Sequence, residues 1–247
     1  MKILGVIPAR FASSRFPGKP LIDIKGKSMI QRVYEQCMAT ELLEEVIVAT
    51  DDQRIFDHVE AFGGKVRMTA EHHRSGTERL VEIAKAEVSF THFVNIQGDE
   101  PFIDPAQIDL LCNVLTADSA VQIATLVHKI HSYKELINPN MPKVVLDEEG
   151  NALYFSRSPI PYIREESEPT KWLEHHDFFR HIGIYAFERE VLLKVPQMKK
   201  SDLEEKESLE QLRWLANGYK IRTAETNKIS FAIDSPEDLD RLLESLA

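Results

Sequence analysis

Apolar residues occur along the first half of the chain in blocks of two kinds. Short, mostly apolar runs of strand type lie at Ile3–Ile7, Val46–Thr50 and Phe93–Ile96. Between these runs, apolar residues recur every three or four positions, as they do on one face of a helix. Strands that alternate with amphipathic helices are typical of βαβ units. The first half is therefore predicted to form a mainly parallel sheet with helices between its strands.

Local signals mark an end of three of the four predicted helices in this half. Gly63–Gly64 ends the second helix. Ser75 and Glu78 form a capping-box pattern that begins the third, and Asp104–Pro105 begins the fourth. The inward stripes of the first, second and fourth helices are Met29, Ile30, Val33, Tyr34, Cys37 and Met38; Ile55, Phe56, Val59 and Phe62; and Ile108, Leu111, Cys112 and Leu115.

The second half changes to a pattern of hairpins and short helices. Residues 144–146 and 152–155 are predicted to pair as a β-hairpin, and His181–Phe187 to form another strand. The polar stretch 164–176 is a candidate mobile loop or lid. A short helix is predicted near Gly218 from Leu209, Leu212, Leu215 and Ala216.

The tail is predicted to contain one strand and one helix. Ser230–Ile233 has the pattern of a strand, and Ser235–Pro236 begins a last helix. The inward residues of this helix are Leu239, Leu242, Leu243 and Leu246.

Composition excludes several classes of protein. The 247 residues allow one large α/β domain or two small ones, and no apolar run reaches the ~18–20 residues of a membrane span. A net charge of −10 disfavours a broad nucleic-acid surface. The N-terminus has no small-residue cleavage site, so a cytoplasmic location is predicted. Cys37 and Cys112 lie on apolar helix faces and are predicted to be core thiols rather than a disulfide or metal pair.

The loop after the first strand concentrates cations in an otherwise acidic chain. It carries Arg10, Arg15 and Lys19, with the hydroxyls of Ser13 and Ser14. Arginine forks and short hydroxyls suit phosphate oxygens, and the carboxyl end of a strand is where such ligands bind in α/β folds. An ordinary solvated basic loop is the alternative, and the strand-end position favours a polyphosphate site.

A second phosphate-binding pattern is only apparent. Gly26-Lys27-Ser28 looks like the end of a P-loop, but position 21, where the first glycine of that motif belongs, is Leu21. Lys27 and Ser28 are therefore predicted to begin a helix.

Two carboxylates, Asp99 and Asp234, directly follow predicted strands. Mg²⁺ takes one or two protein carboxylates and leaves coordination sites for substrate phosphates, so this pair could hold the ion. The alternative is local: Asp99 caps a turn and Asp234 precedes a helix. Spacing alone leaves both open.

The histidines do not form a recognisable zinc site. The pairs His72–His73 and His175–His176 lack the spacing of two helical ligands and are predicted to lie on the surface or in loops. His181, beside Arg180 at the start of a predicted strand, is a candidate polar ligand for an acidic substrate. The chain has no Gly-x-Ser-x-Gly elbow and no reactive-cysteine signature, so covalent catalysis is disfavoured.

Seven strings in one order resemble a known family. They are Ile7–Leu21, Ala49–Asp52, Ser75–Arg79, Gln97–Pro101, Tyr154–Arg157, His181–Tyr185 and Ser208–Arg213, followed by Asp234–Asp238. Together they closely resemble the 3-deoxy-manno-octulosonate cytidylyltransferase (CMP-Kdo synthetase) family. The first string alone is shared loosely with other sugar nucleotidyltransferases, whereas the ordered set is much more specific.

This resemblance implies a fold and a reaction. The fold is α/β: a Rossmann-like nucleotide-diphospho-sugar transferase fold with a mainly parallel mixed sheet and a smaller β-rich portion for sugar binding and dimerisation. Residues 1–247 would form one domain, with 1–130 mainly binding CTP and 131–247 mainly binding the sugar acid and the dimer partner. The reaction is CTP plus Kdo (3-deoxy-D-manno-octulosonate) giving CMP-Kdo and pyrophosphate, for lipopolysaccharide synthesis, in a Mg²⁺-dependent homodimer.

The resemblance also implies roles for individual residues. The catalytic set is Lys19, Arg10, Asp99 and Asp234, with Asp99 and Asp234 as ligands of Mg²⁺. The CTP-binding set is Ala9, Arg10, Ser13, Ser14, Arg15, Lys19, Arg74, Ser75, Gln97 and Asp99. The sugar-acid set is Gln97, Arg157, His181, Tyr185, Glu210 and Gln211. In-line attack of the sugar's anomeric hydroxyl on the α-phosphorus needs positioning and charge neutralisation more than a protein nucleophile.

Four alternatives stay open at this point. The stretch 163–178 departs from the family pattern, so an 8-amino analogue of Kdo is possible, with Glu165, Glu166 or Glu168 meeting its ammonium group. Another acidic sugar, such as sialic acid, is the second alternative. A metal-dependent glycosyltransferase is the third, and pyrophosphate release from CTP would separate the two reactions. A non-catalytic nucleotide-binding regulator is the fourth, but it would not need both Asp99 and Asp234.

Overall fold

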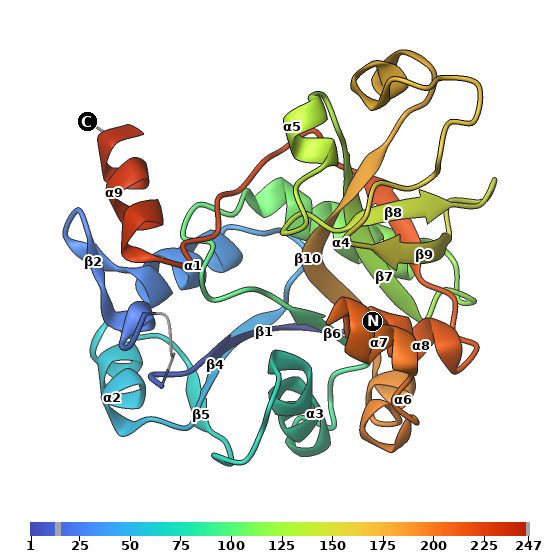
Figure 1. The fold of residues 1–247 in the computed structure, drawn as a ribbon. Helices are drawn as coiled ribbons and strands as arrows, with labels where there is room; N and C mark the ends of the chain where they lie inside the picture. The colour runs from blue at the N-terminus through green and yellow to red at the C-terminus, as the bar shows by residue number, and fades with distance from the viewer. Residues whose placement is uncertain (13–15, 246–247) are drawn as a thin grey trace. The chain divides into compact units, whose positions relative to one another are not determined.

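The computed structural model describes residues 1–12 and 16–245 (Figure 1). The predicted phosphate ligands Ser13, Ser14 and Arg15, and the predicted inward Leu246, lie outside the described residues. The chain divides into two compact units: residues 1–112 with 229–247, and residues 113–228. The functional halves predicted at 1–130 and 131–247 stay a prediction.

The first unit is built on parallel strands. Strand β1 (Ile3–Ala9) pairs in parallel with β4 (Glu45–Thr50) on one side and β6 (His92–Asn95) on the other. Strand β5 (Val66–Met68) pairs in parallel with β4. Only Pro8 of β1 is not fully buried, as expected for a central strand with both faces covered. The three strands predicted in this half are confirmed. A small antiparallel ribbon, β2 (Asp23–Ile24) and β3 (Lys27–Ser28), lies outside this sheet.

Four helices follow the predicted pattern. They are α1 (Met29–Met38), α2 (Gln53–Ala61), α3 (Gly76–Ala86) and α4 (Pro105–Ala117). The Ser28 hydroxyl caps α1 by accepting from the N–H of Gln31, which confirms that Lys27–Ser28 begins a helix. The prediction that Met38 faces inward is wrong: it is the last residue of α1 and is 56% exposed, so the buried face of the helix ends at Cys37.

The start of α3 is a cap of the predicted kind. The Ser75 hydroxyl accepts from the N–H of Glu78, and the Glu78 carboxylate accepts from the N–H of Arg74 at 2.7 Å. These bonds satisfy N–H groups that have no partner within the helix. The first turn of α3 therefore holds the loop that precedes the helix.

The tail joins the first unit through apolar contacts. Helix α9 (Pro236–Ser245) lies beside β2 in Figure 1. Ile24, Met29 and Ile233 form a buried cluster there. Packed against it are Leu239, Leu242 and Leu243, as predicted, with Phe16 and Phe102. The last helix and its inward leucines within the described range are confirmed.

The strand predicted at Ser230–Ile233 is wrong. The segment has no regular secondary structure, and Phe231 is 73% exposed. The N–H of Ile233 donates to the carbonyl of Asp99 at 2.9 Å, but no ladder of bonds continues from it. Residues 230–233 have the alternating apolar pattern but pair with none of the strands among the described residues.

The second unit is a mixed sheet. Strand β10 (Phe179–Glu188) pairs antiparallel with β7 (Ile123–Lys129), and β11 (Arg222–Glu225) pairs in parallel with β7. The hairpin β8 (Lys143–Leu146) and β9 (Ala152–Ser156) joins β10 through β8. The hairpin and the strand around His181 are confirmed, and the α/β class with a mainly parallel sheet and a β-rich portion is confirmed.

Short helices complete the second unit. They are α5 (Tyr133–Leu136), α6 (Arg189–Leu192), α7 (Asp202–Glu207) and α8 (Gln211–Ala216), with 3₁₀ turns η2 (Pro169–Glu174) and η3 (Val195–Gln197). Leu209 is buried but precedes α8 instead of belonging to it. The candidate lid stretch has a folded centre, because Trp172 in η2 is buried with Ile130, Leu136 and Phe178.

Both cysteines are buried and free, as predicted. Burial raises the pKa of the Cys112 thiol to about 12, and it raises the pKa of Cys37 as well. Neither thiol is activated as a nucleophile. Within the described ranges, none of the helices combines the length and apolar character that crossing a bilayer requires.

Candidate active site

A polar cavity of about 510 Å³ lies at the carboxyl ends of β1 and β6. Parallel strands present these ends at one edge, which is why loops distant in sequence meet there. The lining residues are Pro8, Ala9, Arg10, Ala12, Lys19, Pro20, Ser75, Gly76, Arg79, Gln97, Gly98, Asp99 and Asp234. Of the predicted CTP-binding residues, this set includes Ala9, Arg10, Lys19, Ser75, Gln97 and Asp99; Arg74 is exposed beside it.

Gly98 is required by a close approach of two loops. A Cβ atom built on Gly98 would lie 2.8 Å from the carbonyl oxygen of Pro8. Because that neighbour is backbone, it cannot move aside as a flexible side chain would. The glycine lets the loop after β6 lie directly against the end of β1 and brings Asp99 to the cavity.

The centre of the site is a cation between two carboxylates. The Lys19 ammonium lies 2.8 Å from Asp99 Oδ2 and 3.5 Å from Asp234 Oδ1. The side chains of Lys19 and Asp99 are 15% and 24% exposed, whereas that of Asp234 is 48% exposed. The N–H of Ile233, the residue before Asp234, donates to the carbonyl of Asp99 at 2.9 Å and joins the two segments.

Asp234 also precedes a helix, as the local alternative expected, because α9 begins at Pro236. The start of α9 is capped by Asp238, whose carboxylate accepts from the N–H groups of Asp234 and Ser235 at 3.0 and 2.9 Å. The Asp234 carboxylate is turned toward Lys19 instead. Both predicted metal ligands therefore face one shared cation.

This donor set fits Mg²⁺ in one specific way. The described residues contain no group of three or more histidine, cysteine, aspartate or glutamate side chains arranged to hold a metal. Two carboxylates that converge on one positive charge match the sites in which Mg²⁺ keeps water and substrate phosphates as its other ligands.

The basic loop is closed at its base. Gly18, with φ of 72°, donates its N–H to the carbonyl of Phe11 at 3.0 Å. The Arg54 guanidinium lies 3.2 Å from the centre of the Phe11 ring, and Asp52 accepts from Arg54 Nη2 at 2.6 Å. The two ends of the loop are thus pinned, while Arg10 is exposed at the cavity.

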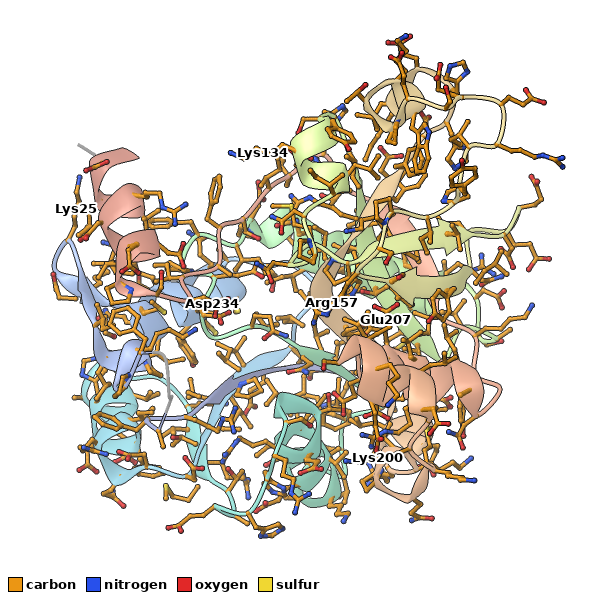
Figure 2. The ribbon with its side chains drawn as sticks, viewed as in Figure 1. Lys25, Lys134, Arg157, Lys200, Glu207 and Asp234 are labelled. Atoms are coloured by element: carbon orange, nitrogen blue, oxygen red, sulfur yellow. The ribbon has the colours of Figure 1, made fainter. Side chains whose placement is uncertain are left out.

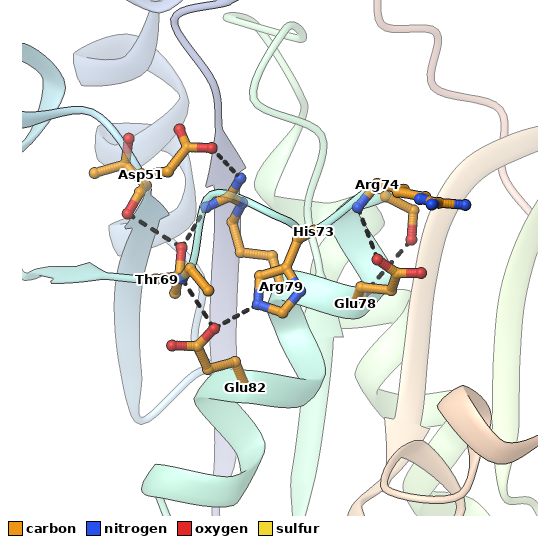
Figure 3. Close-up of polar contacts among 10 residues, drawn as sticks. Asp51, Thr69, His73, Arg74, Glu78, Arg79 and Glu82 are labelled. Carbon is orange, nitrogen blue, oxygen red and sulfur yellow. Dashed lines mark hydrogen bonds and ion pairs between the residues drawn. The ribbon is translucent and has the colours of Figure 1, made fainter.

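A network missed by sequence reasoning supports the loop that carries Arg74 and Ser75 (Figure 3). Arg79, only 1% exposed, donates to the hydroxyl of Thr69 and to Asp51 Oδ2, the latter at 2.7 Å. The Glu82 carboxylate accepts from the N–H of Ala70 and contacts His73. The available signal was a charged residue on the apolar face of α3, which requires a buried partner.

The second unit gathers four of the predicted sugar-acid residues. The rings of His181 and Tyr185, both on β10, are 5.1 Å apart, and the Tyr185 ring lies 4.8 Å from that of Trp214 in α8. Burial and the nearby Glu210 carboxylate raise the pKa of Tyr185 well above its usual value. Gln211 begins α8 and is buried. His181, Tyr185, Glu210 and Gln211 therefore lie in one region.

Two of these side chains have informative chemistry. Burial lowers the pKa of His181 to about 3, so the ring is neutral near pH 7 and can exchange hydrogen bonds but not an ion pair. Its Nε2 lies 3.1 Å from the Thr125 hydroxyl. Gln211 Nε2 is buried and has no hydrogen-bond partner among residues 1–12 and 16–245. A buried donor left without a partner is costly, and a ligand oxygen would satisfy it.

Arg157 lies differently from the expectation for a direct ligand. Its Nε, Nη1 and Nη2 donate to the backbone carbonyls of Glu207, Pro139 and Ser208 at 2.6, 2.8 and 3.3 Å. Figure 2 shows Arg157 and Glu207 next to each other. Two of the five guanidinium N–H groups are left for other partners.

Comparison with known proteins identifies the family. The cytidylyltransferase family matches residues 4–221 of the chain. The chain belongs to this family. The cavity alone does not identify the reaction, whereas membership of this family does. The prediction that the chain is a nucleotidyltransferase is confirmed.

Its relatives have the name that the motifs indicated. A 3-deoxy-manno-octulosonate cytidylyltransferase from Parabacteroides distasonis is 53% identical over 252 residues, covering 100% of this chain and 99% of the relative. One from Cytophaga hutchinsonii is 51% identical over 98% of this chain and 96% of the relative. The resemblance to that family is confirmed.

The solved structures agree. A structure of CMP:2-keto-3-deoxy-manno-octonic acid synthetase complexed with CTP has a TM-score of 0.93 and 44% identity, covering 100% of this chain and 98% of that one. A 4-diphosphocytidyl-2C-methyl-D-erythritol synthase from Anaerococcus prevotii, at a TM-score of 0.62 and 15% identity, shares the fold.

Proposed function

We propose that this cytidylyltransferase transfers the cytidylyl group of CTP to Kdo and releases pyrophosphate. The relatives of similar length have the corresponding name, and a structure that is 44% identical was solved with CTP. Within the chain, the observation that carries the proposal is the Lys19–Asp99–Asp234 cluster in a cavity at the end of β1. Dependence on Mg²⁺, a homodimeric state, a cytoplasmic location and a role in lipopolysaccharide synthesis are parts of the same proposal.

The reaction forms one bond and breaks one. The anomeric oxygen of Kdo attacks the α-phosphorus of CTP in line, and the bond from that phosphorus to the β-phosphate oxygen breaks. The proton of the attacking hydroxyl is released, and pyrophosphate leaves. When bound at Asp99 and Asp234, Mg²⁺ supplies positive charge that neutralises the α-phosphate and favours ionisation of that hydroxyl.

The residues of the first unit would neutralise and orient the nucleotide. Arg10 is exposed at the cavity, and with Lys19 it would bind the β- and γ-phosphates. The Lys19 ammonium has to leave the carboxylates to do so, which would free Asp99 and Asp234 for the metal. Charge on the departing pyrophosphate would then be stabilised by side chains already in the cavity. Ser75, Arg74 and Gln97 would lie near the cytidine.

The residues of the second unit would recognise the sugar acid. Gln211 Nε2 offers a buried donor that has no protein partner among the described residues, and the neutral His181 offers a further hydrogen bond. Tyr185 and Glu210 would contact sugar hydroxyls, and Arg157 has two N–H groups left for the carboxylate. Gln97, which the resemblance also assigns to the sugar acid, belongs to the first unit.

The stretch that departs from the family pattern does not favour an amino sugar. Glu166 lies 3.6 Å from His175, and Glu168 pairs with Lys171 at 2.8 Å. Glu168 therefore already has a cation as its partner, and Glu166 faces an imidazole ring. We therefore propose Kdo, rather than its 8-amino analogue, as the sugar.

A substrate panel tests the proposal. The purified protein is given CTP, Mg²⁺ and one of Kdo, 8-amino-Kdo or sialic acid, and pyrophosphate release and the CMP-sugar mass are measured. We expect rapid release with Kdo and little with sialic acid. Turnover of sialic acid without either Kdo form would overturn the substrate. CTP binding with no turnover of any acid would favour a regulator, and glycosyl transfer from a nucleotide sugar without pyrophosphate release would favour a glycosyltransferase.

A further inference from the structure

The carboxylate of Glu207, at the end of α7, is tied to the end of β9. Its Oε1 accepts from the Ser156 hydroxyl at 2.6 Å, and its Oε2 accepts from the N–H of Arg157 at 2.9 Å. The Ser156 oxygen also accepts from the N–H of Ser158 at 3.1 Å. Both carboxylate oxygens are thus used to hold the segment that leaves β9.

The Arg157 side chain in turn binds the backbone of Glu207 and Ser208. Its Nε donates to the carbonyl of Glu207 and its Nη2 to that of Ser208. Ser156–Arg157 and Glu207–Ser208 therefore exchange four hydrogen bonds. We call this set of four residues the Ser156–Ser208 clamp; the Arg157 and Glu207 sides of it are labelled in Figure 2.

The clamp holds a turn with an uncommon backbone conformation. Ser208 has φ of 52° and ψ of 49°, in the left-handed region that costs a non-glycine residue about 1–3 kcal/mol. This turn ends α7 and directs the chain toward Glu210 and Gln211, two and three residues further on. The conformation is maintained because hydrogen bonds fix the residues at and before it.

Glu207 also balances buried positive charge. Lys143 is fully buried, and its ammonium donates to the carbonyl of Asn138 at 2.8 Å, one residue before the carbonyl that Arg157 binds. Burial and the Arg157 charge lower the pKa of Lys143 to about 8, and Glu207 opposes this shift. Removing the Glu207 charge would leave two neighbouring cations without this compensation.

We propose that Glu207 is a positioning residue for the sugar-acid site: through the Ser156–Ser208 clamp it orients the turn that presents Glu210 and Gln211. The inference rests on the proposed function of that site. This role of Glu207 differs from a general structural one, because α7 and α8 are also joined by a contact outside the clamp. Arg213, 8% exposed, pairs with Glu204 through Nε at 2.8 Å and also through Nη2.

The test compares three variants by steady-state kinetics. Glu207→Gln keeps the size of the side chain but leaves one acceptor oxygen, and its amide would face one of the two donors. Glu207→Asp keeps the charge on a shorter side chain. Glu205→Gln removes an exposed carboxylate from the same helix and is the matched control.

We expect Glu207→Gln to raise the KM for Kdo tenfold or more, with the KM for CTP changed less than twofold. Glu207→Asp should recover part of this loss, and Glu205→Gln should match the unaltered protein. Calorimetric titration of the ligand-free variants with Kdo should show the same order. Should Glu207→Gln not fold, Ser156→Ala removes one bond of the clamp, and a rise of about threefold in the Kdo KM alone is expected.

Two results would overturn the inference. One is an unchanged KM for Kdo in folded Glu207→Gln. The other is an equal rise in the KM for CTP and Kdo, which would indicate a general loss of structure. Failure of the unaltered protein to use any sugar acid would instead overturn the proposed function, and the inference with it.

Discussion

The charged side chains at the cavity of the first unit neutralise one another, whereas in the second unit Tyr185 and Gln211 are buried and His181 is partly buried, with aromatic rings beside His181 and Tyr185. Lys19, Asp99 and Asp234 form a cluster whose outer member is 48% exposed. His181 and Tyr185 lie between the rings of Phe155 and Trp214, and Gln211 is buried beside them. The first arrangement is satisfied without a ligand, and the second leaves a buried donor unsatisfied.

This difference indicates two ways of preparing a site. An ion pair to an exposed carboxylate such as Asp234 contributes about 0–1 kcal/mol, so exchanging that partner of Lys19 for a phosphate or a metal costs little. A buried polar group without a partner costs roughly 1–3 kcal/mol, so a site lined by such groups rejects molecules that cannot complete its hydrogen bonds. If the proposed function holds, the first unit would rearrange on binding and the second would discriminate between sugars.

The largest effect is expected when a negative charge is removed from the Lys19–Asp99–Asp234 cluster. We expect Asp99→Asn and Asp234→Asn each to lower kcat about 100-fold or more at saturating Mg²⁺, because a charged metal ligand contributes several kcal/mol to the transition state. Asp57→Asn, on the exposed side of α2, is the control. Near-normal pyrophosphate release in either folded variant would contradict the assignment.

Replacement of the Lys19 ammonium by a metal ion at Asp99 and Asp234 can be measured without turnover. If the Lys19 ammonium competes with the metal, Lys19→Met should bind Mn²⁺ about tenfold more tightly in the absence of nucleotide, since it removes the competing charge about 3 Å from the ligands. The same variant should lower kcat. Free Mn²⁺ is followed by electron paramagnetic resonance, with Lys27→Met as the matched surface variant. Equal Mn²⁺ affinity in Lys19→Met and the unaltered protein would show that no exchange occurs.

Acid should lower the folding stability of the protein through His181 in the second unit. The pKa of His181 is about 3 in the folded protein and about 6.5 in an unfolded chain. Between these values the unfolded state binds the extra proton, so folding stability falls as the pH falls from 6.5 toward 3, by up to about 1.4 kcal/mol per pH unit from this group. His181→Gln should lack this component. Urea unfolding at pH 7, 6 and 5 measures the difference, and parallel stability curves for the two proteins would refute it.

The smallest effect is expected at the base of the basic loop. Arg54 is 60% exposed and stacks on Phe11, and such contacts contribute about 0.5–1 kcal/mol. Arg54→Ala should therefore raise the KM for CTP about two- to fivefold and leave the KM for Kdo unchanged. Arg241→Ala, also on the surface, controls for loss of a positive charge. A change in the Kdo KM of the same size would remove the distinction between the two regions.

The sequence predicted the parts of the fold that depend on neighbours in the chain. Apolar runs located β1, β4 and β6, and Ser28, Ser75 and Asp104 located helix starts, because a cap needs only the next two or three residues. The same reasoning failed at Ser230–Ile233. Whether an alternating segment becomes a strand depends on a free sheet edge beside it, which the segment itself does not encode.

For the candidate site, the sequence supplied residue types and the structure supplied their partners. The motifs selected Lys19, Asp99 and Asp234, but they assigned Lys19 to phosphate rather than to the two carboxylates. Arg157 was assigned to the sugar acid, and the structure gives three of its nitrogens backbone partners. Arg79 and Glu207 had no predicted role because their partners are 10 to 51 residues away.

By itself, the sequence determined the α/β class and the cytidylyltransferase family, and it predicted the loops that we propose to carry the chemistry. These follow from the period of apolar residues and from short motifs, both of which are local. Only the tertiary structure decided which carboxylates share a cation, that His181 is neutral and that the turn at Ser208 is clamped. Charge state and hydrogen-bond partnership depend on burial and on distances of about 3 Å, and these are set when segments far apart in the chain pack together.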